Sequence, residues 1–131
     1  MNTSSIRWVR AITGTVMAEV AVIAAAFGCV AFYSHVVNPG QPVAAYQAWA
    51  AQAAPWASVV AGMPVFFALG RWWAKGLATA LAIFGLYLLV DGAILFATGL
   101  GGLSPWIVVL SYFTKFAASY AGGRSGRKRA D

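Results

Sequence analysis

The sequence predicts an all-α integral membrane protein, folded as a four-helix up-down bundle with both termini on the cytoplasmic side. Of its 131 residues, 61% are hydrophobic and only 9% are charged, whereas soluble domains have roughly one-quarter charged residues. The apolar residues form long runs, several of them near the length that a helix needs to cross a bilayer. Most basic residues fall between these runs. Composition, run length and charge placement therefore agree on the fold class.

The first predicted span covers residues 11–33. It follows a short polar segment, 1–10, in which Arg7 and Arg10 flank Trp8, a pattern typical of a membrane interface. The run is long enough to span, because a helix rises about 1.5 Å per residue and the hydrocarbon core is roughly 30 Å thick. Small residues spaced four and three apart predict a seam for close helix packing. The seam consists of Gly14, Ala18, Ala21, Ala25 and Gly28.

The second span has two interpretations. Residues 43–54 carry polar and aromatic side chains among alanines, and Pro55 opens a more apolar run that ends at residue 69. Either an interfacial helix over 43–54 precedes a span over 55–69, or one long helix is kinked at Pro55, since proline removes an intrahelical hydrogen bond. The first interpretation is preferred. Pro64 is expected to bend the span, as membrane helices tolerate.

The third predicted span covers residues 77–98, and an uncharged, glycine-rich turn follows it. Ser104 and Pro105 then stand in the order that helix starts prefer. The fourth span accordingly covers 105–121. Residues 122–131 form a basic tail, which is predicted to be disordered.

The basic residues predict the orientation of the four spans. Eight of the nine Lys and Arg residues, all except Lys115, lie in the amino-terminal segment, in the loop between the second and third spans, or in the tail. The two connections on the opposite face have no basic residue. By the positive-inside rule both termini are cytoplasmic. The expected compartment is a plasma membrane, namely the inner membrane of a bacterium.

Three charged residues lie inside the predicted spans. Lipid cannot solvate a charge, so each must face protein or water, pair with an opposite charge, or be neutral. Glu19 is nine residues after Arg10, and Lys115 is nine residues before Arg124. Both therefore lie about 13 Å from the cytoplasmic flank. Because the first and fourth helices of an up-down bundle are normally adjacent, a Glu19–Lys115 ion pair is predicted.

Asp91, the third intramembrane charge, has no basic residue at its own level. Three alternatives stay open for this carboxyl group: it is protonated, it reaches water, or it competes for Lys115. Five polar residues share a helical face with one of the charges: Thr15, Tyr87, Ser111, Tyr112 and Ser119. Three of these are three or four residues from Lys115 and form a polar stripe on its helix.

Two functional hypotheses follow from these charges. The preferred one is a non-catalytic membrane subunit or oligomer, in which the Glu19–Lys115 pair fixes the helix register. The alternative is a proton-coupled transporter or channel for a small solute that uses Glu19, Asp91 and Lys115, because two acids and one base leave a carboxylate free to exchange a proton. The expected partners are membrane lipids and either further copies of the chain or another membrane protein.

Catalysis and nucleic-acid binding are not expected. The chain has one histidine, and it lacks His-Glu-x-x-His, Gly-x-Ser-x-Gly, Cys-x-x-Cys and Walker motifs. No enzymatic activity, metal or cofactor is therefore predicted. Basic residues beside four spans are explained by orientation and by anionic lipid rather than by nucleic acid.

The chain resembles the small multidrug-resistance transporters in its length, in its number of predicted spans and in the glutamate of its first span, Glu19. This resemblance implies that Glu19 is the shared proton and substrate site of a dimer. The chain departs from that family in its one-sided loop charges and in the additional intramembrane charges Asp91 and Lys115. It is therefore not assigned to the family.

Overall fold

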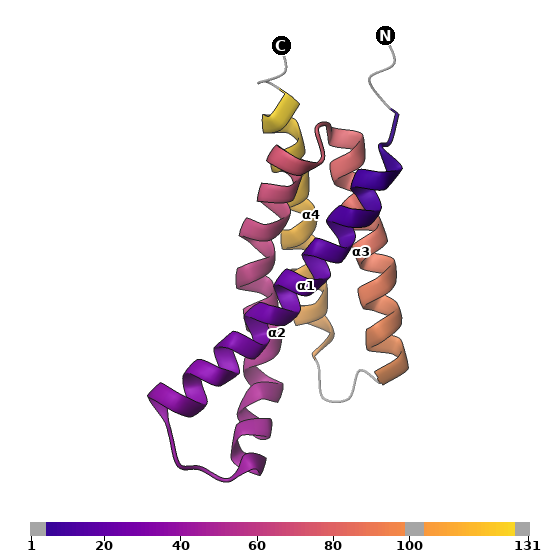
Figure 1. The fold of residues 1–131 in the computed structure, drawn as a ribbon. Helices are drawn as coiled ribbons and strands as arrows, with labels where there is room; N and C mark the ends of the chain where they lie inside the picture. The colour runs from indigo at the N-terminus through magenta and orange to yellow at the C-terminus, as the bar shows by residue number, and fades with distance from the viewer. Residues whose placement is uncertain (1–4, 99–103, 128–131) are drawn as a thin grey trace.

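The computed structural model describes residues 5–98 and 104–127. Four α-helices follow one another along this part of the chain (Figure 1): α1 (Trp8–Phe32), α2 (Val43–Ala68), α3 (Leu77–Thr98) and α4 (Pro105–Arg127). α1 and α2 end in π-helical turns, η1 (Tyr33–Val37) and η2 (Leu69–Trp73). The all-helical prediction is confirmed. Most of the predicted turn over 99–104, the first residues of the amino-terminal segment and the end of the basic tail lie outside the described residues.

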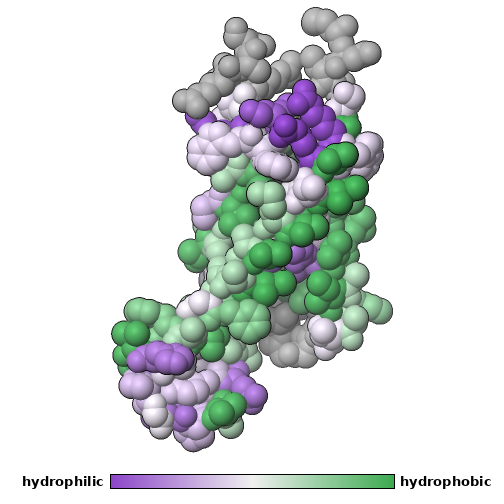
Figure 2. Space-filling view, in the orientation of Figure 1, coloured by the Kyte–Doolittle hydropathy of each residue, from purple (hydrophilic) through white to green (hydrophobic). Residues whose placement is uncertain are grey.

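Three of the helices, taken with their π-helical turns, are long and apolar enough to cross a membrane: Trp8–Val37, Val43–Trp73 and Leu77–Thr98. These helices indicate a membrane protein. Figure 2 shows hydrophobic residues over the middle of the molecule and hydrophilic residues at both of its ends. α4 is not among the three, because Lys115 and several hydroxyl groups interrupt its apolar residues. A fourth span stays a prediction.

The four helices surround a common centre in the order α1, α2, α4, α3. α1 packs on α2 and α3, and α4 packs on the same two helices. In Figure 1, α1 accordingly crosses in front of the other helices and α4 lies behind. The first and fourth helices are therefore diagonal rather than adjacent, and the assumption that led to the Glu19–Lys115 pair is wrong.

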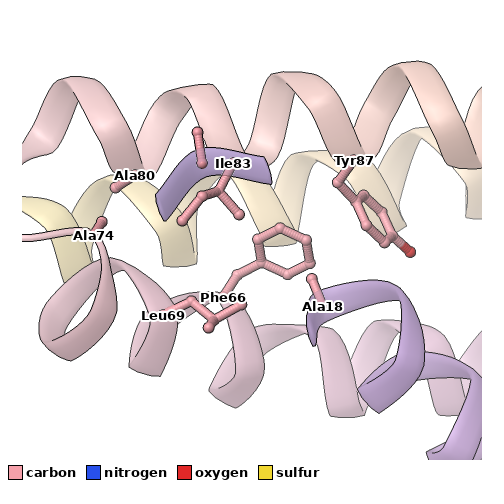
Figure 3. Packing of buried hydrophobic residues seen from close by; sticks show 8 residues of the cluster. Ala18, Phe66, Leu69, Ala74, Ala80, Ile83 and Tyr87 are labelled. Atoms are coloured by element: carbon pink, nitrogen blue, oxygen red, sulfur yellow. The ribbon is translucent and has the colours of Figure 1, made fainter. Parts of the chain in front are cut away.

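Aromatic side chains of α2 and α3 fill the centre of the bundle. Phe66 and Tyr87 are fully buried, and their rings meet edge to face with 4.8 Å between centroids. Figure 3 shows these rings with Ala18 of α1 beside them. The predicted seam on α1 is buried at Ala18, which lies beside the rings, and at Gly14, which lies against Ile83 and Trp73. Its last residue, Gly28, is exposed and has no neighbour within 4 Å of an added Cβ.

α2 is one continuous helix that contains both Pro55 and Pro64. This continuity agrees with the alternative of one long helix rather than with the preferred, separate helix over 43–54, and the kink expected at Pro55 stays a prediction. A proline removes one backbone donor, but membrane helices accept this loss where neighbouring groups compensate.

Aromatic contacts hold the first turns of α2 against the end of α1. The ring of Tyr33 stacks on that of Trp49 with 3.9 Å between centroids. The hydroxyl of Tyr46 donates a hydrogen bond to the carbonyl oxygen of Asn38 at 2.8 Å. These contacts close the turn between the two helices. The joined ends of α1 and α2 project beyond the described ends of α3 and α4 (Figure 1), and we call this region the hairpin tip.

α4 continues to Arg127 instead of ending at residue 121. The last turns of the helix pack closely on its neighbours. A Cβ added at Gly122 would overlap the backbone carbonyl oxygen of Phe67 on α2, so only glycine allows the two helices to lie this close. Three further glycines make similar approaches between α4 and its neighbours: Gly70, Gly123 and Gly126. We call these four residues the glycine seam.

Basic residues and tryptophans gather where α1 begins and α4 ends. The guanidinium of Arg10 donates to the carbonyl oxygen of Trp73 at 2.8 Å, and the indole of Trp73 donates to the carbonyl oxygen of Arg10 at 3.0 Å. The guanidinium also lies 5.3 Å from the Trp73 ring centroid. Arg71 lies over the ring of Trp72 in the same way. This composition suits a membrane interface, and the side that it faces stays a prediction.

Candidate functional site

Lys115 is the most deeply buried charge among the described residues, with 1% of its surface exposed. Its Nζ donates to the Oγ of Ser58 on α2 and to the Oγ of Ser111 on α4, both at 2.7 Å. Nζ also lies 5.1 Å from the ring centroid of Tyr87 and 5.8 Å from that of Tyr112. Hydroxyl oxygens and aromatic faces therefore stabilise this cation.

The predicted ion pair between Glu19 and Lys115 is not formed. Nζ directs its hydrogen bonds to two serines, and no carboxylate in the described part of the chain forms an ion pair with it. The reason is the order of the helices. Glu19 and Lys115 lie on the diagonal helices α1 and α4, while the buried rings of Phe66 and Tyr87 meet across the other diagonal.

Glu19 is half-buried on α1, and its Oε1 is buried without a hydrogen-bond partner among the described residues. The charges of Asp91 and Lys115 lie near enough to act on its carboxyl group. Thr15, expected to support Glu19, instead donates to the carbonyl oxygen of Ala11 at 2.8 Å. Because nothing holds Oε1, a proton can bind there without breaking a hydrogen bond.

Asp91 is half-buried on α3, where its Oδ2 accepts a hydrogen bond from the hydroxyl of Tyr112 on α4. Within the described residues, the side chain of Asp91 makes no other hydrogen bond. The tyrosine expected beside it, Tyr87, behaves differently. The hydroxyl of Tyr87 is buried without a hydrogen-bond partner in the described part, and its ring faces Lys115 instead.

A cavity of about 540 Å³ lies between α2, α3 and α4. Alanine and aliphatic side chains make up most of its lining, which also includes Asp91, Tyr112 and the two serines that hold Lys115. The ammonium group of Lys115 is thus separated from the cavity by the hydroxyls of Ser58 and Ser111, to which it donates hydrogen bonds. Of the three alternatives for Asp91, this arrangement agrees with access to a space that water or a solute can enter.

Two residues of this site were not predicted, Ser58 and Gly62 on α2. A Cβ added at Gly62 would lie 2.5 Å from Cε of Lys115, so the glycine leaves room for the lysine stem. Ser58 and Gly62 are four residues apart and therefore share a helical face. In the sequence, the site on α2 is therefore indicated by a serine and a glycine that lie one helical turn apart.

Ser119, predicted to accompany Lys115, has a different role. It is 1% exposed, and its hydroxyl donates to the carbonyl oxygen of Ala80 on α3 at 2.8 Å. It therefore ties α4 to α3 rather than supporting the cation. Of the polar stripe predicted on α4, Ser111 and Tyr112 reach the cavity and Ser119 does not.

The site combines a buried cation, two carboxyl groups and a cavity, without an ion pair among them in the described residues. Charges inside membrane helices are usually paired or functional, which makes this combination the candidate site of the molecule. Comparisons of the chain with known protein families, with curated proteins and with solved structures find no match.

Proposed function

We propose that this protein binds a small solute in the cavity between α2, α3 and α4 and couples the movement of that solute to a proton carried by Glu19. The observation that carries the proposal is the cavity itself, with Asp91 on its wall and Lys115 behind two of its hydroxyls. Cavities of roughly 300–1,000 Å³ with a few polar groups are typical of small-molecule sites.

A purely structural role for the charges has less support than the sequence suggested. That role required the Glu19–Lys115 pair to fix the helix register. The glycine seam and the bond from Ser119 to Ala80 already hold α4 against α2 and α3. The three charges are therefore free to act in binding and proton exchange.

A subunit or oligomer is the second candidate function. α1 presents a row of exposed apolar side chains away from the bundle: Val16, Val20, Ile23 and Phe27. Such a face is covered by lipid or by another membrane helix. The two candidates are compatible, because the cavity is lined by α2, α3 and α4 whereas this row belongs to α1.

In this proposal α4 is a fourth span, the end of the molecule with Arg10 and Trp73 faces the cytoplasm, and the membrane is a plasma membrane. The positive-inside rule supports this orientation. The cavity, lined by the first half of α2 and the last part of α3, then lies toward the other side of the membrane.

The coupling follows from the electrostatics of the interior. The carboxyl group of Glu19 lies within electrostatic range of Asp91 on α3 and of Lys115 on α4. A charged solute that enters beside Asp91 changes the electrostatic potential at Glu19. A proton then binds to the unpartnered carboxylate oxygen or leaves it, so solute binding and proton binding are linked.

The test is flux in proteoliposomes that contain a trapped pH-sensitive dye. Small amines, carboxylates, amino acids and sugars are added one at a time, with and without a pH gradient. At least one solute is expected to change the internal pH with the wild-type protein. Glu19→Gln should abolish this change, and Glu19→Asp, which keeps a carboxyl group, should retain part of it. Absence of flux for every solute under every gradient would overturn the proposal.

A further inference from the structure

We infer that the solute is a small zwitterion, whose ammonium group binds Asp91 and whose anionic group binds the hydroxyls of Ser58 and Ser111. The inference rests on the proposed function, since it names the class of ligand for the same cavity. Its basis is that one cavity presents hydrogen-bond donors on one side and a carboxylate acceptor on another.

The two serines supply the donor side. Each serine oxygen accepts an N–H of Lys115 at 2.7 Å, which leaves the hydroxyl hydrogen available. Among the described residues, the hydroxyl of Ser111 has no acceptor, and the hydroxyl of Tyr87 lies near that of Ser58 without forming a hydrogen bond of standard geometry. A hydroxyl that accepts from an ammonium group becomes a stronger donor, because successive hydrogen bonds polarise one another. The positive charge of Lys115 is therefore presented to the cavity through two hydroxyls, where it favours an anionic ligand group.

Asp91 supplies the acceptor side. Tyr112 donates to its Oδ2, and no residue of the described chain donates to its Oδ1. Because Asp91 belongs to α3 while Ser58 and Ser111 belong to α2 and α4, the two sides lie on different helices around the same space. A carboxylate in this position forms a charge-assisted hydrogen bond with a ligand ammonium.

A ligand with both charges matches both sides of the cavity. A ligand with one charge would leave either Asp91 or the Lys115 cation without a counter-charge, and a buried uncompensated charge is costly. Apart from Gln52 and Tyr112, the remaining lining is apolar, with Ala51, Leu95 and Ile107 among its residues. The volume of about 540 Å³ leaves room for an aliphatic side chain. A free amino acid and a zwitterionic lipid headgroup share this chemistry.

The decisive experiment is calorimetric titration of the purified full-length protein in detergent with four probes. L-leucine carries both charges, isoamylamine lacks the carboxylate, and 4-methylpentanoate lacks the ammonium. Glycerophosphoethanolamine represents the lipid headgroup. We expect leucine or glycerophosphoethanolamine to bind at least tenfold more tightly than either singly charged probe. Whichever of the two binds more tightly then identifies the source as free solute or lipid.

Two variants locate the charges of the ligand. Asp91→Asn should weaken leucine binding at least tenfold and leave 4-methylpentanoate binding unchanged. Ser58→Ala should weaken leucine and 4-methylpentanoate binding and leave isoamylamine binding unchanged. Thr98→Ala, at an exposed position on the same helix as Asp91, is the control and should change no affinity.

The inference would be overturned if neither leucine nor glycerophosphoethanolamine bound more tightly than the singly charged probes, and also if none of the four probes bound. These outcomes need only the wild-type protein, so a variant that fails to fold does not weaken the test. Flux of amines alone in proteoliposomes would overturn the inference and keep the proposed transport. Tight leucine binding without flux of any solute would overturn the proposed transport and keep the inference of a zwitterionic ligand.

Discussion

The two halves of this molecule are held together by different kinds of contact. Where α1 begins and α4 ends, the glycine seam brings the backbone of α4 against the backbones of α2 and η2. Toward the other end, α2, α3 and α4 are kept apart by the cavity, and the Lys115 stem fills the space beside Gly62. A backbone carbonyl group is held in place by its helix, whereas the aliphatic part of a lysine side chain can change its rotamer. Rigid and adaptable packing are thus placed in separate halves of one bundle.

The largest expected effect comes from Gly122→Ala in the rigid half. The added Cβ would overlap the Phe67 carbonyl oxygen, and no side-chain rotation relieves this contact. We expect a loss of about 2–3 kcal/mol in the free energy of unfolding, measured by titration with sodium dodecyl sulfate in mixed micelles.

Gly28→Ala is the matched control for that substitution. It adds the same methyl group to a helical glycine that has nothing within 4 Å of the new Cβ. It should leave stability unchanged or raise it by about 0.5–1 kcal/mol, because alanine is the better helix former. A similar loss at both positions would mean that the glycine seam is not what fixes α4.

A smaller effect is expected from Gly62→Ala in the adaptable half. The new Cβ would meet Cε of Lys115 at 2.5 Å, but the flexible stem can change its rotamer at a cost of about 0.5–1.5 kcal/mol. Because the stem then carries Nζ away from its serines, leucine affinity in the titration should fall even though the protein still folds. Equal destabilisation by Gly62→Ala and Gly122→Ala would remove the contrast between the two halves.

The smallest effect on stability is expected from Lys115→Met. Replacing a buried charge with an apolar side chain of similar volume is often neutral or stabilising, so the free energy of unfolding should stay within about 1 kcal/mol of the wild-type value or rise. Solute binding should be lost. Lys75→Met, which removes an exposed charge, should affect neither quantity.

A large loss of stability in Lys115→Met would support the opposite view. Breaking a buried pair costs about 3–5 kcal/mol, so a loss of that size would show that the cation has a structural counter-charge. The hypothesis of a register-fixing charge would then replace the proposed binding role.

The helical class was predictable because composition and run length depend on nothing beyond the chain itself. Which helices pack against each other was not predictable, because this depends on which backbones can approach closely. Gly122 and Gly123, followed by Arg124, looked like the start of a disordered tail. Their role becomes visible only when Phe67 and Leu77 lie opposite them.

The same distinction applies to the candidate site. Ser111 was predictable as a partner of Lys115, because residues four apart on a helix share a face. Ser58 was not, since its contact joins two helices that are far apart in sequence. The ion pair to Glu19 was predicted from equal depth and from the usual adjacency of the first and fourth helices, and these two helices are diagonal in the structure. Residue spacing therefore predicts contacts within a helix better than contacts between helices.

The hairpin tip has a consequence for how the protein meets a bilayer. α1 with η1 has 30 residues and α2 with η2 has 31, whereas α3 has 22, which corresponds to about 45 Å against about 33 Å of helix. Only the shorter length matches a hydrocarbon layer of roughly 30 Å. In a bilayer centred on α3, polar residues of the tip, such as His35, Asn38 and Gln41, would therefore extend beyond the hydrocarbon layer toward the lipid headgroups. In that bilayer the protein would extend farther from the membrane along α1 and α2 than along α3, so a molecule arriving from that side would meet a step rather than a level surface.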